Sequence, residues 1–294
     1  MASLANILGV KQKPPVKEAY ERPKLDLSGP SLTSAFETLT VVSEEHGGIE
    51  KYVDALKLKS QLFEEVFKNG ADTPLEPTVI KGISLVMPTV RRRIPTYLED
   101  GEKFEVLRTA IAGLLEGMED TRTTDDRIAS FCACFPTDKS HRWVRDLASE
   151  ILHNTDLERY PQMNRWIWDS AANTGVLREI WYDAEIDHIK LDIPDGYATF
   201  IMLREEVAQF LSDNGVYKDM FHYMDLLFAQ VYSDYITSQG GTYLRADFSI
   251  PDDPMEHTRR LLGLDVVRYK NLAHAEETEE EQTVALIDTK LMMS

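Results

Sequence analysis

The sequence predicts an all-α protein with a two-lobed core of many helices, an extended arm at each end and at most a minor β-hairpin. In nearly every long segment, apolar residues recur at the three-and-four spacing of one helix face. Prolines, Gly-Gly and Asn-Gly pairs stand where these apolar stripes end, as is typical of helix termini. Alternation of apolar and polar residues, which would indicate a strand, is weak between Tyr243 and Ile250.

The first part of the chain predicts an arm followed by a helical lobe. Residues 1–30 contain four prolines. Because proline removes a backbone donor and stops a helix, this segment is expected to be an extended arm. An N-terminal helical lobe is expected over residues 31–137. Its clearest helices run over residues 49–67 and 104–118. Asn69-Gly70 would end the first of them.

Two shorter segments complete the N-terminal lobe. Residues 79–87 form an apolar run that fits either a buried helix or a strand, since periodicity does not separate the two in a short run. Thr124 is expected to cap a helix that reaches Phe135, because its hydroxyl oxygen can accept from the free N–H groups of a first turn. Asp125 and Asp126 would lie in that first turn.

A C-terminal helical lobe is expected over residues 138–263. Its apolar stripes predict helices over residues 140–153, 162–172, 174–190, 200–211 and 220–235, and a last one through Leu261 and Leu262. Asn214-Gly215 and Gly240-Gly241 would end two of these helices. Residues 264–294 are expected to form a C-terminal arm whose acidic run, Glu276–Glu281, is a linker by composition.

Composition narrows the class of protein. The chain has 294 residues, of which 43% are hydrophobic and 28% charged, as in a globular protein with a sizeable core. No segment has the roughly 18 consecutive apolar residues of a membrane span, and the first residues lack the basic region of a signal peptide. Cys132 and Cys134 are too close for an ordinary disulfide, which indicates a reducing, cytoplasmic location.

Two clusters contain residue types that bind metals, but neither spacing favours a metal. Cys132 and Cys134, with His141 and His153 downstream, would point their sulfurs about 200° apart on a helix, so two small buried thiols are the simpler interpretation. Asp120, Asp125 and Asp126 resemble a magnesium site in composition. They lack the one-turn spacing of such a site, and helix capping explains them.

Sequence motifs of catalysis and nucleotide binding are absent. The chain contains no G-x-x-x-x-G-K-[ST], no G-x-G-x-x-G and no G-x-S-x-G. The histidines are scattered, and no serine or cysteine partner is indicated by their positions. We therefore expect a protein without catalytic residues, metal or cofactor.

A triple arginine is the most concentrated basic feature of a chain whose formal net charge is -18. Arg91, Arg92 and Arg93 repel one another unless they meet anions, and a guanidinium suits phosphate oxygens. Either they form part of an RNA groove or they pair with acidic residues of the same chain. The same groove would include further arginines interleaved with aromatic residues, a pattern typical of single-strand binding: Arg142, Arg145, Arg165 and Arg178, beside Trp143, Tyr160, Trp166 and Trp168. For Trp143 and Trp166 individually, packing in the core is the simpler interpretation, because aromatic residues at helical spacing are more often buried.

Both ends carry features of association. Apolar side chains near the termini are candidate oligomerisation residues, namely Leu4, Ile7, Leu8, Leu286, Ile287 and Leu291. Residues 11–24 are net basic, whereas Glu276–Glu281 is strongly acidic. Opposite charge at opposite ends also fits two solvated tails.

This layout of a basic arm, a helical core and a second arm resembles nucleoproteins of negative-strand RNA viruses and, more loosely, helical coat proteins of filamentous viruses. The resemblance covers organisation. It implies that two helical lobes hold single-stranded RNA in a basic cleft, that the arms grip neighbouring copies in a homo-oligomer or filament, and that the protein is virion-associated.

Two other classes of function remain open at this point. A helical adaptor or regulatory protein would bind a protein partner through the acidic C-terminal tail and carry no RNA. An all-α enzyme would use Asp120, Asp125 and Asp126 with magnesium. The RNA-coating hypothesis explains both arms and the arginines, and is therefore preferred.

Overall fold

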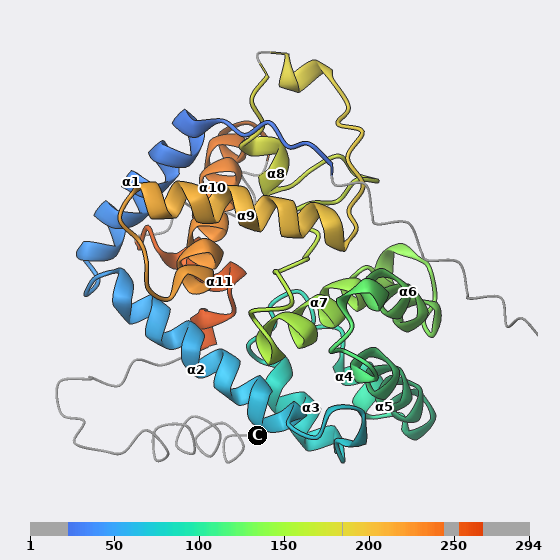
Figure 1. The fold of residues 1–294 in the computed structure, drawn as a ribbon. Helices are drawn as coiled ribbons and strands as arrows, with labels where there is room; N and C mark the ends of the chain where they lie inside the picture. Colours follow the sequence, from blue (N-terminus) through green and yellow to red (C-terminus); the bar gives the residue numbers. More distant parts are fainter. Residues whose placement is uncertain (1–22, 184, 244–252, 267–294) are drawn as a thin grey trace, which may run out of the picture.

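The computed structural model describes residues 23–183, 185–243 and 253–266. These residues form eleven α-helices and no strand, and their β-type contacts are two isolated bridges. The all-α prediction is therefore confirmed. In chain order the helices are α1 (Gly29–Glu44), α2 (Ile49–Phe67), α3 (Pro77–Ser84), α4 (Pro95–Leu98), α5 (Gly101–Leu115), α6 (Thr124–Ala133), α7 (Trp143–Thr155), α8 (Val176–Glu179), α9 (Tyr197–Asp213), α10 (Met220–Tyr243) and α11 (Glu256–Leu261) (Figure 1).

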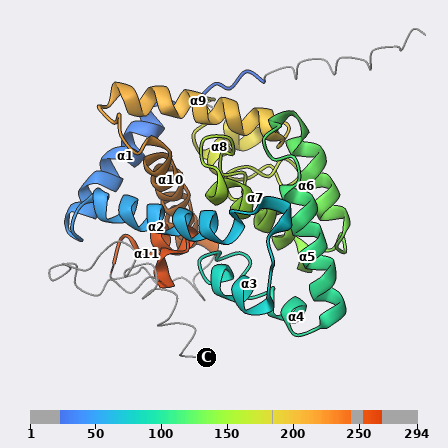
Figure 2. The ribbon, with the colours of Figure 1, turned by 60° about the horizontal axis from the view of Figure 1, so that its bottom comes forward.

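Helices α7 and α10 occupy the interior of the molecule. Helix α1 lies beside α10, and α9 runs across the top of the view in Figure 2. Helices α5 and α6 lie on the side away from α1, beyond α7. Eleven of the 13 residues of α7 are buried. A helix that is buried on all sides must satisfy its polar side chains inside the protein, and α7 does so as described below.

The strongest apolar stripes form helices close to the predicted bounds, and residues 79–87 resolve mainly into the helix α3. Gly70 and Gly215 take φ values of 56° and 86°, the left-handed region that glycine enters freely, just after α2 and α9 end. Helix α10, however, continues through Gly240-Gly241 to Tyr243, so the end predicted there is wrong. A glycine lowers helix stability by about 1 kcal/mol relative to alanine but does not forbid a helix.

The helices predicted over residues 162–172 and 174–190 are wrong. Apart from the one-turn α8 and a single 3-10 turn at Ile186–His188, this part of the chain is irregular. Asn173 and Gly175 take φ values of 55° and 126°, and a Cβ at Gly175 would lie 2.6 Å from the carbonyl oxygen of Ile167. Residues 160–169 are mostly buried, and burial on several sides gives their apolar residues a spacing like that of a helix. Backbone N–H groups of this segment bond to side chains of α7.

Helices of both predicted lobes share one hydrophobic core. Helix α1 packs against α10, and α2 packs against α7. Buried residues from residues 31–137 and from residues 138–263 form a single cluster. The boundary placed at residue 137 is therefore not a boundary of the core.

The described residues nearest the two ends pack onto the body of the protein. Leu25 is buried, Leu27 forms a bridge with Trp181, and α1 begins at Gly29 with Ser28 as its cap. The last residues of the predicted arm 1–30 are therefore part of the core. Leu264, at the start of the predicted arm 264–294, is also buried.

The remainder of both predicted arms lies outside the described residues, as do the segment expected to be extended after Tyr243 and the six candidate oligomerisation residues, Leu4, Ile7, Leu8, Leu286, Ile287 and Leu291. Within the described ranges, no helix combines the length and apolar character that crossing a membrane requires.

Candidate functional site

The polar face of α7 lies against a mostly buried irregular segment, residues 160–169. Buried backbone groups need hydrogen-bond partners, and loops are rarely buried for this reason. Side chains of α7 supply these partners. The N–H of Met163 donates to Ser149 Oγ (2.7 Å), and the N–H of Arg165 donates to Asp146 Oδ1 (3.0 Å). The polar face of α7 therefore replaces the helical hydrogen bonds that the segment lacks.

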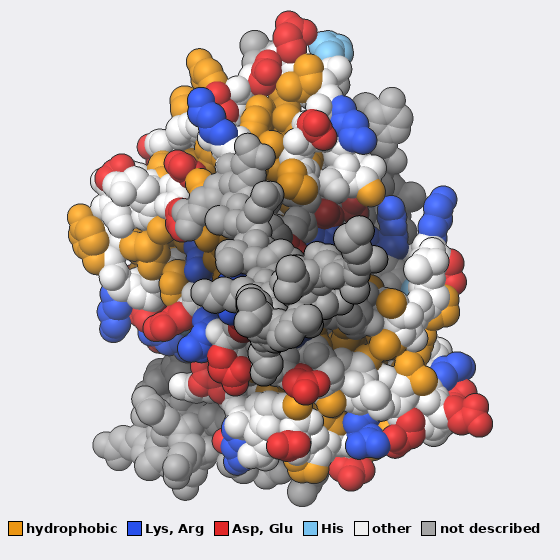
Figure 3. Space-filling view, turned by 45° about the vertical axis from the view of Figure 1, so that its right-hand side comes forward, with side chains coloured by type: hydrophobic (Ala, Val, Ile, Leu, Met, Phe, Trp, Pro, Cys, Tyr) orange, Lys and Arg blue, Asp and Glu red, His pale blue; other side chains and the backbone are white. Residues whose placement is uncertain are grey.

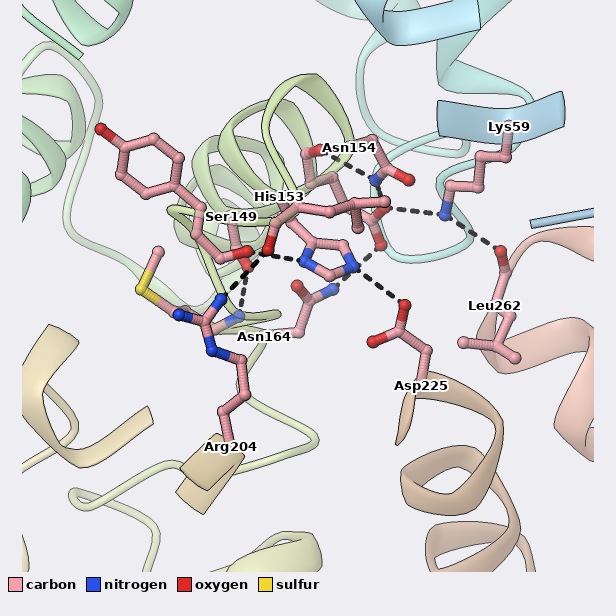
Figure 4. A network of polar contacts seen from close by, with 12 residues as sticks. Lys59, Ser149, His153, Asn154, Asn164, Arg204, Asp225 and Leu262 are labelled. Atoms are coloured by element: carbon pink, nitrogen blue, oxygen red, sulfur yellow. Dashed lines mark hydrogen bonds and ion pairs between the residues drawn. The ribbon is translucent and has the colours of Figure 1, made fainter. Parts of the chain in front are cut away.

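Glu150 accepts hydrogen bonds from Lys59, Asn154 and Asn164 in a buried polar network, and Figure 4 labels these three donors. Lys59 of α2 donates from Nζ to Glu150 Oε2 (2.8 Å) and to the carbonyl oxygen of Leu262 (3.0 Å). Asn154 Nδ2 donates to the same Oε2 (3.1 Å), and Asn164 Nδ2 donates to Oε1 (3.0 Å). The carboxylate thus joins α2, α7 and the buried segment, and Lys59 links it to the end of α11.

His153 connects the same network to α10. Its Nε2 lies 3.0 Å from Asp225 Oδ2, and its Nδ1 lies 2.9 Å from the carbonyl oxygen of Tyr160. Both partners accept hydrogen bonds, so both ring nitrogens carry protons. Burial disfavours this imidazolium, but the charge of Asp225 and the hydrogen bonds raise the pKa of His153 above its ordinary value.

His222, on the same helix as Asp225, behaves in the opposite way. Its Nε2 is buried without a hydrogen-bond partner among the described residues. Burial lowers the pKa of His222, and the positive charge of His153 lowers it further, against the attraction of Asp225 and Asp219. His222 therefore stays neutral where His153 is charged.

The network holds the fold together and does not meet solutes. Its six residues are each at most 5% exposed: Lys59, Glu150, His153, Asn154, Asn164 and Asp225. Every charge in it has a partner of opposite sign within 3.0 Å. These residues were not expected from the sequence, because Glu150 and Asn154 fit the polar, solvent-facing side of a helix equally well.

A hollow of about 390 Å³ on the surface brings together three of the arginines predicted to bind RNA. Arg142, Arg145 and Arg165 line it, together with Lys139 and His141. It lies where the end of α6 meets the start of α7, and Cys132 and residues 136–138 complete its wall. Lys139 was not expected at this site, although it stands only three residues before Arg142.

Two arginines of the hollow are held by carboxylates. Arg145 bonds to both the carboxylate and the carbonyl oxygen of Asp195. Burial opposes ionisation of Asp195, but the charge of Arg145 and its hydrogen bond lower the pKa of that carboxyl. Arg165 donates from Nη2 to Asp146 Oδ2 (3.0 Å), while its Nε is buried and unpaired among the described residues.

Two other predicted RNA-binding arginines lie elsewhere and are also paired internally. Arg178 donates to the carbonyl oxygens of Ile186 and Ile189. Arg91 makes a two-pronged ion pair with Asp265, with nitrogen–oxygen distances of 2.9 and 2.7 Å. The alternative of internal pairing therefore describes Arg91, Arg145 and Arg165, and Arg178 is held by backbone oxygens.

Four cations near the hollow and the triple arginine have side chains without a hydrogen bond or ion pair among the described residues. They are exposed and occupy two neighbouring segments: Arg92 and Arg93 before α4, and Lys139 and Arg142 before α7. The segments are joined by aromatic packing. The ring of Tyr97 in α4 lies 5.4 Å from that of Trp143 and 6.2 Å from that of His141.

The face of the molecule shown in Figure 3 is not a wide basic surface. On the face shown in Figure 3, acidic and basic side chains of the described residues are interspersed. An anion would therefore be attracted locally, by a few cations, within a molecule of strongly negative net charge.

The aromatic residues expected beside the arginines belong to the core. Tyr160 and Trp168 are fully buried, and Trp143 and Trp166 are 4% and 8% exposed. Tyr160 Oη accepts from Arg127, and Trp168 Nε1 donates to the carbonyl oxygen of Ile193. Bases of a bound nucleic acid would not stack on these rings.

The residues considered for metal binding have other partners. Cys132 is half-buried in the wall of the hollow, where burial raises its pKa, whereas Cys134 is exposed just after α6, so the expectation of two buried thiols is wrong for Cys134. His141 bonds to Asp138 at 2.9 Å. Within the described ranges no group of three or more His, Cys, Asp or Glu side chains could hold a metal ion.

Two residues of the acidic cluster, Asp120 and Asp125, cap helices, but neither caps α6, the helix for which capping was predicted. Hydrogen bonds from Arg122 lower the pKa of Asp120 to about 2. Asp125 Oδ1 accepts from the N–H of Tyr197 (2.8 Å) and so caps α9 from another helix. The predicted cap at Thr124 is wrong, because a 3-10 turn runs directly into α6 and Thr124 Oγ1 donates to the carbonyl oxygen of Thr121 (2.7 Å).

No protein-family model, no curated protein and no solved structure matches this chain.

Proposed function

We propose that this chain is a structural protein that binds the phosphate backbone of single-stranded RNA and associates with further copies of itself through its terminal segments. The observation that carries the proposal is the pair of neighbouring surface segments with unpaired cations, Arg92 with Arg93 and Lys139 with Arg142. Most other arginines of this region are already bonded within the chain.

Unpaired guanidiniums in an anionic protein favour a phosphate ligand. An arginine that already holds a carboxylate must lose that bond before it meets RNA, whereas an unpaired one exchanges only water and counterions. Arg92 and Arg93 are adjacent in sequence, so an external anion bound to both would reduce their mutual repulsion. The buried aromatic rings leave phosphate contact as the main source of affinity, so binding should show little preference for sequence.

The first experiment measures binding of a labelled oligouridine to the full chain by fluorescence anisotropy at several salt concentrations. We expect Arg92→Ala/Arg93→Ala and Lys139→Ala/Arg142→Ala each to weaken binding. Each lost phosphate contact should reduce the slope of log K against log[salt] by about 0.7. Lys24→Ala/Lys190→Ala is the matched control, because it removes two exposed cations that are also unpaired among the described residues.

The second experiment examines self-association, for which Leu4, Ile7, Leu8, Leu286, Ile287 and Leu291 are the candidate contacts. Protein purified without nuclease is imaged by electron microscopy, and its absorbance ratio is measured. Rings or filaments that carry nucleic acid are expected. A monomer free of nucleic acid, with salt-independent or absent oligouridine binding, would contradict the proposal and favour the adaptor hypothesis. In that case deletion of residues 276–294 should abolish capture of a protein partner.

A further inference from the structure

The hollow between the end of α6 and the start of α7 is lined mainly by side chains of one charge. Among the described residues that line it, five are of basic type and one is acidic: Lys139, His141, Arg142, Arg145 and Arg165, against Asp138. Asp138 is already engaged, because its Oδ1 accepts from the N–H and the hydroxyl of Ser140 (2.7 and 2.6 Å) and lies 2.9 Å from His141 Nδ1. The lining therefore carries an excess of positive charge.

Lys139 and Arg142 are the cations of the hollow that are open to a ligand. Both are exposed, and neither side chain has a hydrogen bond or ion pair among the described residues. They stand three residues apart, at the two ends of the 3-10 turn that leads into α7. In a 3-10 turn, residues i and i+3 lie on the same side. One anion in the hollow can therefore meet both cations.

Arg145 and Arg165 add two positive charges in fixed positions. Arg145 bonds to the carboxylate and the carbonyl oxygen of Asp195. Arg165 Nη2 donates to Asp146 Oδ2 (3.0 Å). Neither carboxylate is among the residues that line the hollow. A guanidinium has five N–H groups, so a carboxylate on one side leaves donors for a second anion. The internal bonds also hold both side chains in place, which lowers the ordering cost of binding.

The walls of the hollow rest on buried aromatic residues. Phe135 and Trp143, which flank residues 136–142, are 5% and 4% exposed, and their rings lie 6.2 Å apart. The ring of Tyr97 lies 5.6 Å from that of Phe135 and 5.4 Å from that of Trp143. Three largely apolar side chains complete the lining: Cys132, Pro136 and Val144. The site is therefore formed before a ligand arrives, and it offers both apolar surface and positive charge.

We propose that the hollow binds a phosphomonoester, namely the terminal phosphate of an RNA chain, in preference to a phosphate within the chain. This inference rests on the proposed RNA-binding function and names the part of the RNA that Lys139 and Arg142 recognise. A phosphomonoester carries a charge of about −1.5 to −2 at pH 7 and three acceptor oxygens, whereas a phosphate within the chain carries about one charge. The two unpaired cations match the larger charge.

The size of the hollow favours an end group over a length of chain. Its volume of about 390 Å³ lies near the lower end of the range for small-molecule sites, about 300–1,000 Å³. A single nucleotide with its terminal phosphate suits a site of this size. Arg92 and Arg93 are not among the residues that line the hollow, so they remain available to phosphates within the chain. The two pairs of cations should therefore respond differently to the end of the RNA.

The test in solution compares two oligouridines that carry a 3′ label and differ only at the 5′ end, which is a phosphate or a hydroxyl. By anisotropy, the full chain should bind the 5′-phosphorylated form about tenfold more tightly at low salt, as hydrogen bonds between charged groups predict. Lys139→Ala/Arg142→Ala should abolish this ratio. Arg92→Ala/Arg93→Ala, the matched control, should weaken binding of both forms and preserve the ratio.

Two further variants separate the charge of the hollow from other effects. Lys139→Arg/Arg142→Lys retains both charges and should retain the preference for the 5′-phosphorylated form. Lys24→Ala/Lys190→Ala removes two exposed cations elsewhere and should leave the ratio unchanged. A thermal melt of each variant checks that it is folded, which we expect because all the substituted side chains are exposed.

A second measurement locates the ligand without RNA. Cys132 lines the hollow and is half-buried, whereas Cys134 is exposed and is not among the lining residues. Uridine 5′-monophosphate should slow alkylation of Cys132 and leave that of Cys134 unchanged, while uridine should slow neither. Tandem mass spectrometry distinguishes the two cysteines. Lys139→Ala/Arg142→Ala should remove the protection of Cys132.

The outcomes separate the two proposals. Equal binding of the two oligouridines by the wild type would overturn the terminal-phosphate site and leave the RNA function standing. If neither oligouridine binds but uridine 5′-monophosphate protects Cys132, the RNA function fails and the hollow stands as a phosphomonoester site. A ratio that survives Lys139→Ala/Arg142→Ala would overturn the proposal, because the terminal phosphate would then bind elsewhere. Equal protection of Cys132 by inorganic phosphate, with no preference between the oligouridines, would assign the hollow to free phosphate and overturn the RNA end as its ligand.

Discussion

The buried network around Glu150 and the surface segments around Arg92 and Arg142 use the same kinds of charge in different ways. In the interior, Lys59 and His153 each have a carboxylate partner, and their side chains are 3% and 5% exposed. On the surface, Arg92 and Arg142 are exposed and have no partner in the described part of the chain. Charge in the interior determines how helices fit together, whereas charge on the surface is available to a ligand.

The difference follows from the cost of removing a charge from water. A buried charge must be paired and hydrogen-bonded, since an isolated one costs several kcal/mol. An exposed charge is solvated and needs no partner, so its presence implies little about stability. The two regions should therefore respond oppositely to mutation, one in stability and the other in binding.

The largest expected effect is on the network. Glu150→Ala leaves Lys59 buried without its carboxylate and removes the acceptor of Asn164, so we expect a loss of about 3–5 kcal/mol in the free energy of unfolding. Urea denaturation followed by circular dichroism measures this loss. Lys59→Met/Glu150→Leu removes both charges and should recover much of the stability. A change below 1 kcal/mol for Glu150→Ala would contradict the central role of the network.

His153 should give an intermediate effect that depends on pH. Its folded pKa is raised, so its stabilisation is fully present below the unfolded value of about 6.5 and is lost as pH rises through the folded pKa. We expect His153→Gln to lose about 2 kcal/mol near pH 6 and less at higher pH. Denaturation midpoints of both proteins across this range test the sign.

His222 is the matched control for that experiment. Its folded pKa is lowered, so the neutral form is favoured in the fold and its effect on stability has the opposite sign. The wild type should lose stability through His222 as pH falls below about 6.5, and His222→Gln should remove this loss. Parallel pH profiles for both variants would show that neither histidine titrates as described.

The smallest expected effect on stability is on the surface. Arg92→Ala/Arg93→Ala removes no hydrogen bond or ion pair within the described residues, so the free energy of unfolding should change by no more than about 0.5 kcal/mol. Oligouridine binding should nevertheless weaken. A thermal melt and an anisotropy titration on one preparation check both statements. A large loss of stability would show that these arginines, like Lys59, contribute to the stability of the fold.

Much of the fold was predictable because α2, α5, α9 and α10 carry long apolar stripes on one helical period. Residues 162–190 were mispredicted for a physical reason. Burial on several sides spaces apolar residues much as a helix does, and nothing local in the sequence reveals that Ser149 and Asp146 accept from the backbone there. Asn173 also takes a positive φ there, and its Oδ1 accepts from the N–H of Leu191, 18 residues away.

The candidate site was predictable in part. The residue types and their clustering in sequence pointed to Arg91, Arg92, Arg93 and Arg142. The sequence did not indicate the partners of these arginines, since Asp265 lies 174 residues from Arg91, and Asp195 lies 50 residues from Arg145. Ion pairs of this separation are made by packing and leave no local pattern.

The all-α class, the long helices and the opposite charge of residues 11–24 and 276–281 follow from the amino-acid order alone, because they depend on neighbours along the chain. Which arginines are paired, which helix is central and which carboxylates are buried were decided by tertiary packing. Contacts between distant residues determine solvation, and solvation determines whether a charge supports the fold or remains open to a ligand.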